Sequence, residues 1–221
     1  MDLSKAYDCL PHDLLIAKLE AYGIERKSLK LIYSYLNGLK HRVKVASHYS
    51  SYKKIKIDVP QGSVLGPLLF NIFINDLFLI NLQSGLCNFA GDNTLYACGH
   101  SFELVVSNLE NDLEKILDWF FRNNMVANPG KFQLMFLGWK ETEHLGLNIN
   151  GQIICASDKV KLLCVTIDKK LTFGQHVKDL CMKVSTKVKA LSRLSNYIDL
   201  NQARILLNAV IMSNFNYCPL I

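Results

Sequence analysis

Apolar side chains recur three and four residues apart in several segments of this 221-residue chain. Leu109, Leu113, Ile116 and Phe120, for example, would share one face of a helix. Glycine and proline residues bound these segments and mark where the helices should begin and end. The pattern predicts six helices, over residues 11–23, 24–38, 67–80, 101–124, 175–197 and 201–215.

Short stretches of alternating apolar and polar residues predict strands between these helices. Residues 147–155 contain an Asn-Gly pair, which is typical of a tight hairpin turn. Residues 41–47 and 52–59 alternate apolar with basic side chains and are expected to be two half-buried strands. Further strands are expected over residues 131–138 and 158–168 and on both sides of the turn within residues 88–96.

Strands joined by hairpins, rather than by regular helical crossovers, favour the α+β class. We therefore expect an antiparallel sheet with helices packed on one face. From about Phe173 onward the pattern is helical only. This predicts a first domain over residues 1–172 and a helical subdomain over residues 173–221.

The net charge of +6 conceals four blocks of alternating sign. Residues 26–56 carry nine Lys or Arg and no acid, and residues 159–193 carry nine bases and two acids. Residues 1–25 and 57–158 are acidic, at −3 and −7. Two basic faces about an acidic centre would suit a polyanion held beside a metal site. The alternative is that each basic block is only a solvated face.

The remaining composition narrows the class of protein. The first residues are polar, so no signal peptide is predicted, and the most apolar run is too short and too polar to span a bilayer. Seven cysteines, none in a C-x-x-C pair, are expected to be reduced and mostly buried, without zinc or disulfides. We expect an intracellular protein that is not secreted and does not enter a membrane.

Three segments could carry chemistry. DLSKAYD begins at Asp2, whose carboxylate could bind a hard cation. PQGSVLGPLLF is a glycine-bearing loop that precedes a helix. NFAGDNTLY predicts a hairpin with Asp92 at its tip, although Gly-Asp is also an ordinary hairpin-turn pair.

In this order and spacing the three segments resemble the palm of reverse transcriptases, in particular those of LINE-type (non-LTR) retrotransposons. NPGKFQLMFLG and the stretch from Val160 to Ile221 extend the resemblance to the segment that follows the palm and to the thumb. The resemblance implies RNA-directed DNA synthesis on an RNA template and DNA primer. A dNTP would be joined to the primer 3′-OH, with two Mg²⁺ ions assisting the transfer.

The resemblance also implies roles for particular residues. Asp2 and Asp92 would be catalytic metal ligands. Relatives carry two adjacent carboxylates on the hairpin, whereas this chain reads Phe89-Ala90-Gly91-Asp92, so Gly91 marks a degenerate catalytic position. Because glycine has no side-chain oxygen, we expect weak activity or none.

Tyr7 would lie under the nucleotide sugar and select dNTP over NTP, unless it is an ordinary strand aromatic. Gln61 and Gly62 would line the nucleotide and template side, unless they form a plain turn before a helix. Lys131 would aid the departing pyrophosphate, unless it is a solvated lysine after a Pro-Gly turn. The cations expected to track the nucleic-acid backbone are Lys178, Lys183, Lys187 and Arg193.

Against the family, the chain begins within the first catalytic strand, so the fingers that normally precede it are expected to be missing and the thumb to be truncated. Two alternatives to an impaired polymerase fragment remain at this point. One is a nucleic-acid-binding remnant without catalysis, and the other is an unstable product with exposed sheet edges. The sequence predicts no oligomeric state.

Overall fold

The computed structural model describes residues 6–55, 57–60, 62–139, 145–149 and 151–219. The chain forms two compact units, the first from residues 1–132 and 147–154 and the second from residues 133–146 and 155–221. The sequence predicts a domain boundary after residue 172, where the pattern becomes helical only, and this boundary stays a prediction.

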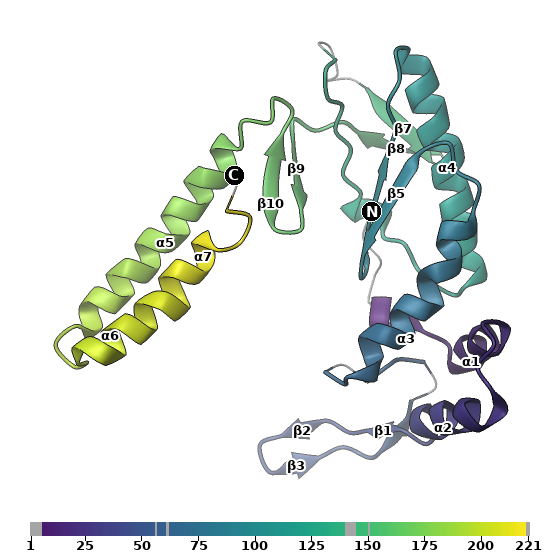
Figure 1. The fold of residues 1–221 in the computed structure, drawn as a ribbon, viewed down its shortest axis with the longest axis horizontal. Helices are drawn as coiled ribbons and strands as arrows, with labels where there is room; N and C mark the ends of the chain where they lie inside the picture. The colour runs from purple at the N-terminus through teal and green to yellow at the C-terminus, as the bar shows by residue number, and fades with distance from the viewer. Residues whose placement is uncertain (1–5, 56, 61, 140–144, 150, 220–221) are drawn as a thin grey trace. The chain divides into compact units, whose positions relative to one another are not determined.

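Helices form most of the first unit, close to where the sequence predicts them (Figure 1). The longer helices are α1 (His12–Ala21), α2 (Arg26–Leu36), α3 (Leu65–Ile74) and α4 (Phe102–Arg122). The short 3₁₀ helices are η1 (Ala6–Cys9), η2 (Asn75–Leu79) and η3 (Pro129–Lys131). The helix predicted over residues 67–80 is therefore divided between α3 and η2.

The core of the first unit is centred on α3. Phe70 and Phe73 are fully buried, and residues of α1, α2 and α4 close around them. Burial of each such side chain contributes about 1.5–3 kcal/mol. The surrounding core residues are Leu10, Leu15, Leu19, Leu29, Leu36, Val59, Leu69, Ile74, Leu77, Ile116, Phe120 and Met125.

A nearly buried lysine joins the helices around this core. Lys18 donates hydrogen bonds to the Phe73 carbonyl at 2.8 Å and to Asp76 Oδ1 at 2.7 Å. Its ammonium also lies over the rings of Phe73 and Trp119, at 4.3 and 4.7 Å. Burial lowers the pKa of Lys18 in spite of the hydrogen bond and charge of Asp76. Asp76 thus neutralises the Lys18 ammonium.

The α+β class is confirmed, although the described strands pair two by two rather than in one continuous sheet. The pairs are β1 (Lys40–His41) with β4 (Lys53–Lys54), β2 (Lys44–Val45) with β3 (His48–Tyr49), β5 (Gly85–Phe89) with β6 (Asp92–Tyr96), β7 (Gly146–Ile149) with β8 (Gln152–Cys155), and β9 (Lys159–Leu162) with β10 (Val165–Asp168). The hairpins predicted within residues 88–96 and 147–155 are confirmed.

Four strand predictions are wrong in detail. Where two half-buried strands were expected over residues 41–47 and 52–59, residues 40–54 contain four two-residue strands whose residues are all exposed. Residues 158–168 are two strands, since Leu163 and Cys164 adopt positive φ (45° and 69°) and turn the chain back. In the stretch 131–138, only the bridge from Leu134 to Ala156 forms.

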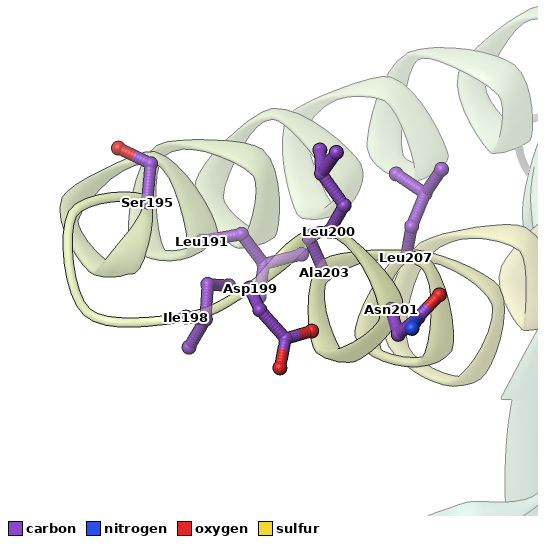
Figure 2. A pocket seen from close by; sticks show the side chains of 8 residues that line it. All are labelled: Leu191, Ser195, Ile198, Asp199, Leu200, Asn201, Ala203 and Leu207. Carbon is purple, nitrogen blue, oxygen red and sulfur yellow. The ribbon is translucent and has the colours of Figure 1, made fainter.

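The second unit contains a helical hairpin. Its helices are α5 (Gly174–Leu194), α6 (Leu200–Leu206), the π-helix η4 (Leu207–Met212) and α7 (Ser213–Phe215). Asp199 caps α6 by accepting a hydrogen bond from Gln202 N at 2.8 Å. An apolar pocket lies where α5 turns into α6 (Figure 2), lined in part by Leu191 and Leu207. No residue of α5 is fully buried, so the apolar stripe predicted for this helix is only partly covered.

Two further findings concern the surface. Six cysteines are exposed and Cys9 is half-buried, so the prediction of mostly buried cysteines is wrong. Among the described residues, no helix is both long enough and apolar enough to cross a bilayer.

Asp58 carries backbone strain. Its φ of 121° lies in a region that favours glycine, and its Oδ1 atom is buried with no hydrogen-bond partner among the described residues. Burial, together with the nearby Asp8 carboxylate, raises the pKa of Asp58. The strained conformation is held on both sides, because Asp58 N donates to the Leu10 carbonyl at 3.1 Å and Val59 N donates to the Tyr7 carbonyl at 3.3 Å.

Asp58→Gly should therefore stabilise the protein by about 1–2 kcal/mol at neutral pH, since glycine relieves the strain and removes the buried carboxylate. A raised pKa in the folded state means that the carboxylate destabilises increasingly as the pH rises through that pKa. The gain should therefore shrink on acidification. Urea unfolding at pH 4 and pH 7 measures both effects, with Asp58→Ala as the control that keeps the strained φ. An equal gain from both variants would show that φ carries no strain.

Asp112 of α4 is a buried carboxylate that holds the chain entering β5. Its Oδ2 accepts hydrogen bonds from Gln83 N and Ser84 N, both at 2.7 Å, and its Oδ1 accepts one from Lys115 Nζ at 2.9 Å. Burial alone would raise the pKa of Asp112. The Lys115 ammonium and the two backbone donors outweigh burial, so this pKa lies below its ordinary value.

Asp112→Asn should cost about 2–3 kcal/mol of stability, because the two backbone donors and Lys115 lose their charged acceptor. A lowered pKa in the folded state gives stability that is complete above the unfolded pKa and is lost as the pH falls through the folded pKa. Asp118→Asn is the matched control, since Asp118 pairs with Arg122 on the exposed face of the same helix. Equal unfolding free energies for the two variants would contradict the anchoring role.

Candidate active site

The β5–β6 hairpin presents Asp92 at its tip. Phe89 and Asp92 are the last paired residues of the ladder, and Ala90 and Gly91 form the turn between them. The left-handed residue of this turn is Ala90, at φ 51°, so the turn does not depend on Gly91 for that conformation. Asp92 is exposed, and Gly91 adds no side-chain oxygen beside it.

Two asparagines, which sequence reasoning missed, brace the turn from beneath. Asn88 and Asn93 are direct cross-strand partners. The Nδ2 of Asn88 donates to the Ala90 carbonyl at 2.7 Å and to Asn93 Oδ1 at 3.0 Å, and Asn93 Nδ2 donates to the Gly91 carbonyl at 3.3 Å. The sequence signal that could have revealed this bracing is that Asn88 and Asn93 lie equally far in sequence on either side of the turn. The bracing fixes the backbone from which the Asp92 side chain extends.

The hairpin has an inner and an outer face, because side chains alternate along a strand. Leu86 and Leu95 form a cross-strand pair on the inner face and pack against the core of the first unit. Asn93, on the same face, is also buried. Asp92 and Phe89 lie on the opposite face, where Phe89 is 67% exposed. The hairpin is thus anchored by one face, and Phe89 and Asp92 are exposed on the other.

Tyr7 rests on the same core. It lies in η1 rather than on a strand, is half-buried, and stacks at a tilt on Phe70, with 4.6 Å between the ring centroids. Its carbonyl accepts a hydrogen bond from Val59 N at 3.3 Å, which ties it to the start of the glycine-bearing loop. The core therefore supports both Tyr7 and the inner face of the hairpin.

The glycine-bearing loop turns tightly before α3. Ser63 N donates to the Pro60 carbonyl at 3.1 Å, and Gly66 N donates to Ser63 Oγ at 3.0 Å. Gly62 has a φ of 79°, which favours glycine, and a side chain there would meet open space. Asp2 and Gln61, which the sequence assigns to the site, lie outside the described residues.

The remaining predicted site residues are cations, and all of them except Lys187 are exposed. Lys131 ends η3, a turn that begins at Asn128, whose Oδ1 accepts from Gly130 N at 3.1 Å. On α5, Lys178, Lys183 and Arg193 are exposed. Lys187 differs, because its ammonium donates to the Val210 carbonyl at 3.2 Å and to Asn214 Oδ1 at 2.9 Å.

Within the described part of the chain, no three His, Cys, Asp or Glu side chains gather closely enough to hold a metal ion. Asp92 alone supplies one carboxylate, which does not complete the oxygen set that a Mg²⁺ pair requires. The described residues therefore do not by themselves fit a two-ion centre.

Comparison with known proteins assigns the family. The model of the family "Reverse transcriptase (RNA-dependent DNA polymerase)" matches residues 1–167. The probable RNA-directed DNA polymerase from transposon BS of Drosophila melanogaster is 29% identical over 214 residues, covering 89% of this chain and 22% of the relative. The RNA-directed DNA polymerase from mobile element jockey of Drosophila funebris is 28% identical over 201 residues, covering 88% and 22%.

A third relative agrees. The probable RNA-directed DNA polymerase from transposon X-element of Drosophila melanogaster is 26% identical over 192 residues, covering 85% of this chain and 21% of the relative. The chain thus spans about a fifth of the length of these curated relatives. The resemblance to reverse transcriptases of non-LTR retrotransposons is confirmed, and the chain belongs to the reverse transcriptase (RNA-dependent DNA polymerase) family.

Proposed function

We propose that this chain is the palm and part of the thumb of a retrotransposon reverse transcriptase whose nucleotidyl-transfer centre is impaired. The observation that carries the proposal is the hairpin tip, where an exposed Asp92 stands beside Gly91 on a braced turn. Family membership supplies the reaction, and the glycine at the tip supplies the reason for the impairment.

In this proposal Asp92 and Asp2 provide the carboxylates for the two Mg²⁺ ions of the family. These ions, when bound, lower the barrier to attack by the primer 3′-oxygen and stabilise the departing pyrophosphate. Because Gly91 stands where relatives carry a carboxylate, the centre has one negative charge fewer to balance the charge of the metal ions. Even the loss of a residue that only supports a metal ligand costs about 10–100-fold in affinity or activity, so the loss of a direct ligand should cost more.

The other residues take positioning roles. Tyr7, held against Phe70, would support the nucleotide sugar and exclude a 2′-hydroxyl. Gly62 has open space beside it, and with Gln61 it would let the nucleotide and template approach the backbone closely. Lys131 would stabilise the negative charge of the pyrophosphate as it leaves.

Restoring the carboxylate should restore function. Gly91→Asp is expected to raise dNTP incorporation on a primed RNA template at least about 100-fold. Gly91→Asn is the matched control, since it adds the same bulk without the charge. Titration with Mn²⁺, followed by the loss of its free-ion magnetic resonance signal, should show tighter binding in Gly91→Asp alone. Robust primer extension by the unaltered chain, equal to that of Gly91→Asp, would refute the impairment.

A second function is favoured by the cations of α5. Lys178, Lys183 and Arg193 are exposed and form no ion pair among the described residues. Asp179, the acidic residue of this helix, accepts a hydrogen bond from Gln175 instead. The chain would then serve as a nucleic-acid-binding remnant that tracks the phosphates of an RNA–DNA duplex without catalysis.

Lys178→Gln with Lys183→Gln should weaken binding to an RNA–DNA duplex and reduce the slope of log affinity against log salt by roughly 1.8. Lys187→Gln is the informative comparison. Because Val210 and Asn214 hold its ammonium, this change should lower thermal stability and leave the salt slope almost unchanged. Fluorescence anisotropy at several salt concentrations measures the slope. If Lys187→Gln changed the salt slope and Lys178→Gln with Lys183→Gln did not, the result would contradict this assignment.

A further inference from the structure

Residues 39–55 form a hairpin that the proposed catalytic centre does not use. Its two ladders are β1 with β4 and β2 with β3, and their residues are exposed throughout. Figure 1 shows β2 and β3 extending away from α2 to a free end. Each arm of about eight residues spans about 25 Å. None of the buried core residues comes from this segment, so the fold does not explain its composition.

The register places basic side chains opposite one another. Lys40 faces Lys54, and His41 faces Lys53. Like charges directly across a strand pair are destabilising. Residues 39–55 contain no acid, and the described residues form no ion pair with their lysines or Arg42. Asp58 lies near His41 at the base of the hairpin, but neither lysine of the Lys40–Lys54 pair forms an ion pair among the described residues. An anion from outside the protein would remove this repulsion.

The same hairpin carries an exposed set of flat side chains. The guanidinium of Arg42 lies 3.9 Å from the ring centre of Tyr49 and 4.8 Å from that of Tyr52, and the Lys44 ammonium lies 5.4 Å from Tyr49. Tyr49 is 51% exposed and Tyr52 is 60% exposed. Aromatic rings and guanidinium planes stack on nucleobases whose faces are unpaired, whereas a duplex hides those faces.

We propose that residues 39–55 are a binding platform for single-stranded RNA, with Lys40 and Lys54 on its phosphates and Arg42, Tyr49 and Tyr52 against its bases. The choice of RNA as the occupant rests on the proposed function, because members of the family copy RNA. The platform itself needs neither a metal ion nor Asp92. It connects to the glycine-bearing loop that begins at Val59, so it would hold template close to the core that supports the centre.

The first test measures binding of a fluorescent, unstructured single-stranded RNA to the full chain without Mg²⁺. Lys40→Gln with Lys54→Gln should weaken binding more than about tenfold and reduce the salt slope by roughly 1.4, as expected for two phosphate contacts on a single strand. The matched control is Lys27→Gln with Lys30→Gln, which removes the same charge from the exposed face of α2. The control should change affinity less than about threefold. Equal losses in both variants would overturn the platform, because general charge would then explain binding.

The second test separates stacking from charge. Tyr49→Ser with Tyr52→Ser should reduce affinity for single-stranded RNA by about tenfold and leave binding to an RNA–DNA duplex unchanged. Far-ultraviolet circular dichroism should remain that of the unaltered chain, because the hairpin lies outside the core. Equal weakening for both nucleic acids would overturn the proposal. The proposal would also be overturned if the hairpin variants kept RNA binding and lost binding only to phosphatidylserine vesicles, because the partner would then be a membrane.

These outcomes are independent of catalysis. If Gly91→Asp fails to incorporate dNTP but the hairpin variants lose RNA binding as expected, the proposed polymerase function fails and the platform stands. If Gly91→Asp is active and the hairpin variants bind RNA as tightly as the unaltered chain, the platform fails and the polymerase function stands.

Discussion

Burial of the apolar face of α3 is the interaction on which the rest of the first unit depends. Residues of α1, α2 and α4 pack around Phe70 and Phe73. Tyr7, Val59 and the inner face of the β5–β6 hairpin pack against the same core. These contacts join segments that lie more than eighty residues apart in the sequence. Apolar packing thus positions the polar groups of the proposed centre, because these polar groups alone would not hold one another in place.

Charge is divided between structural and functional roles. Asp112 and Asp76 are neutralised by Lys115 and Lys18, so they stabilise the fold and are not available to a ligand. Asp92 instead sits exposed on a turn that two asparagines brace. Lys40 and Lys54 face one another across the β1–β4 pair. In this arrangement the Asp112 and Asp76 carboxylates are paired within the fold, whereas Asp92, Lys40 and Lys54 form no ion pair among the described residues.

The sequence predicted helices and tight hairpins well, because helical spacing and Asn-Gly or Gly-Asp turns are local signals. It missed features that depend on tertiary contact. The turn at Leu163 and Cys164 has no characteristic turn residues, and the Lys18–Asp76 pair joins residues 58 apart. The sequence over residues 41–59 alternates as half-buried strands would, yet the strands that form, within residues 40–54, are exposed. At the site, the position of Asp92 was predictable from its motif, whereas the bracing by Asn88 and Asn93 became visible only once the register was known.

The account depends most directly on Asp2 and Asp92 sharing one cation site. A crystal structure of the chain grown with Mg²⁺ would measure the separation of their carboxylates. Because Mg²⁺ binds oxygen at about 2.1 Å, oxygens that share the ion should lie no more than about 4 Å apart. Ordered carboxylates of Asp2 and Asp92 on opposite faces of the β5–β6 hairpin would contradict the nucleotidyl-transfer centre.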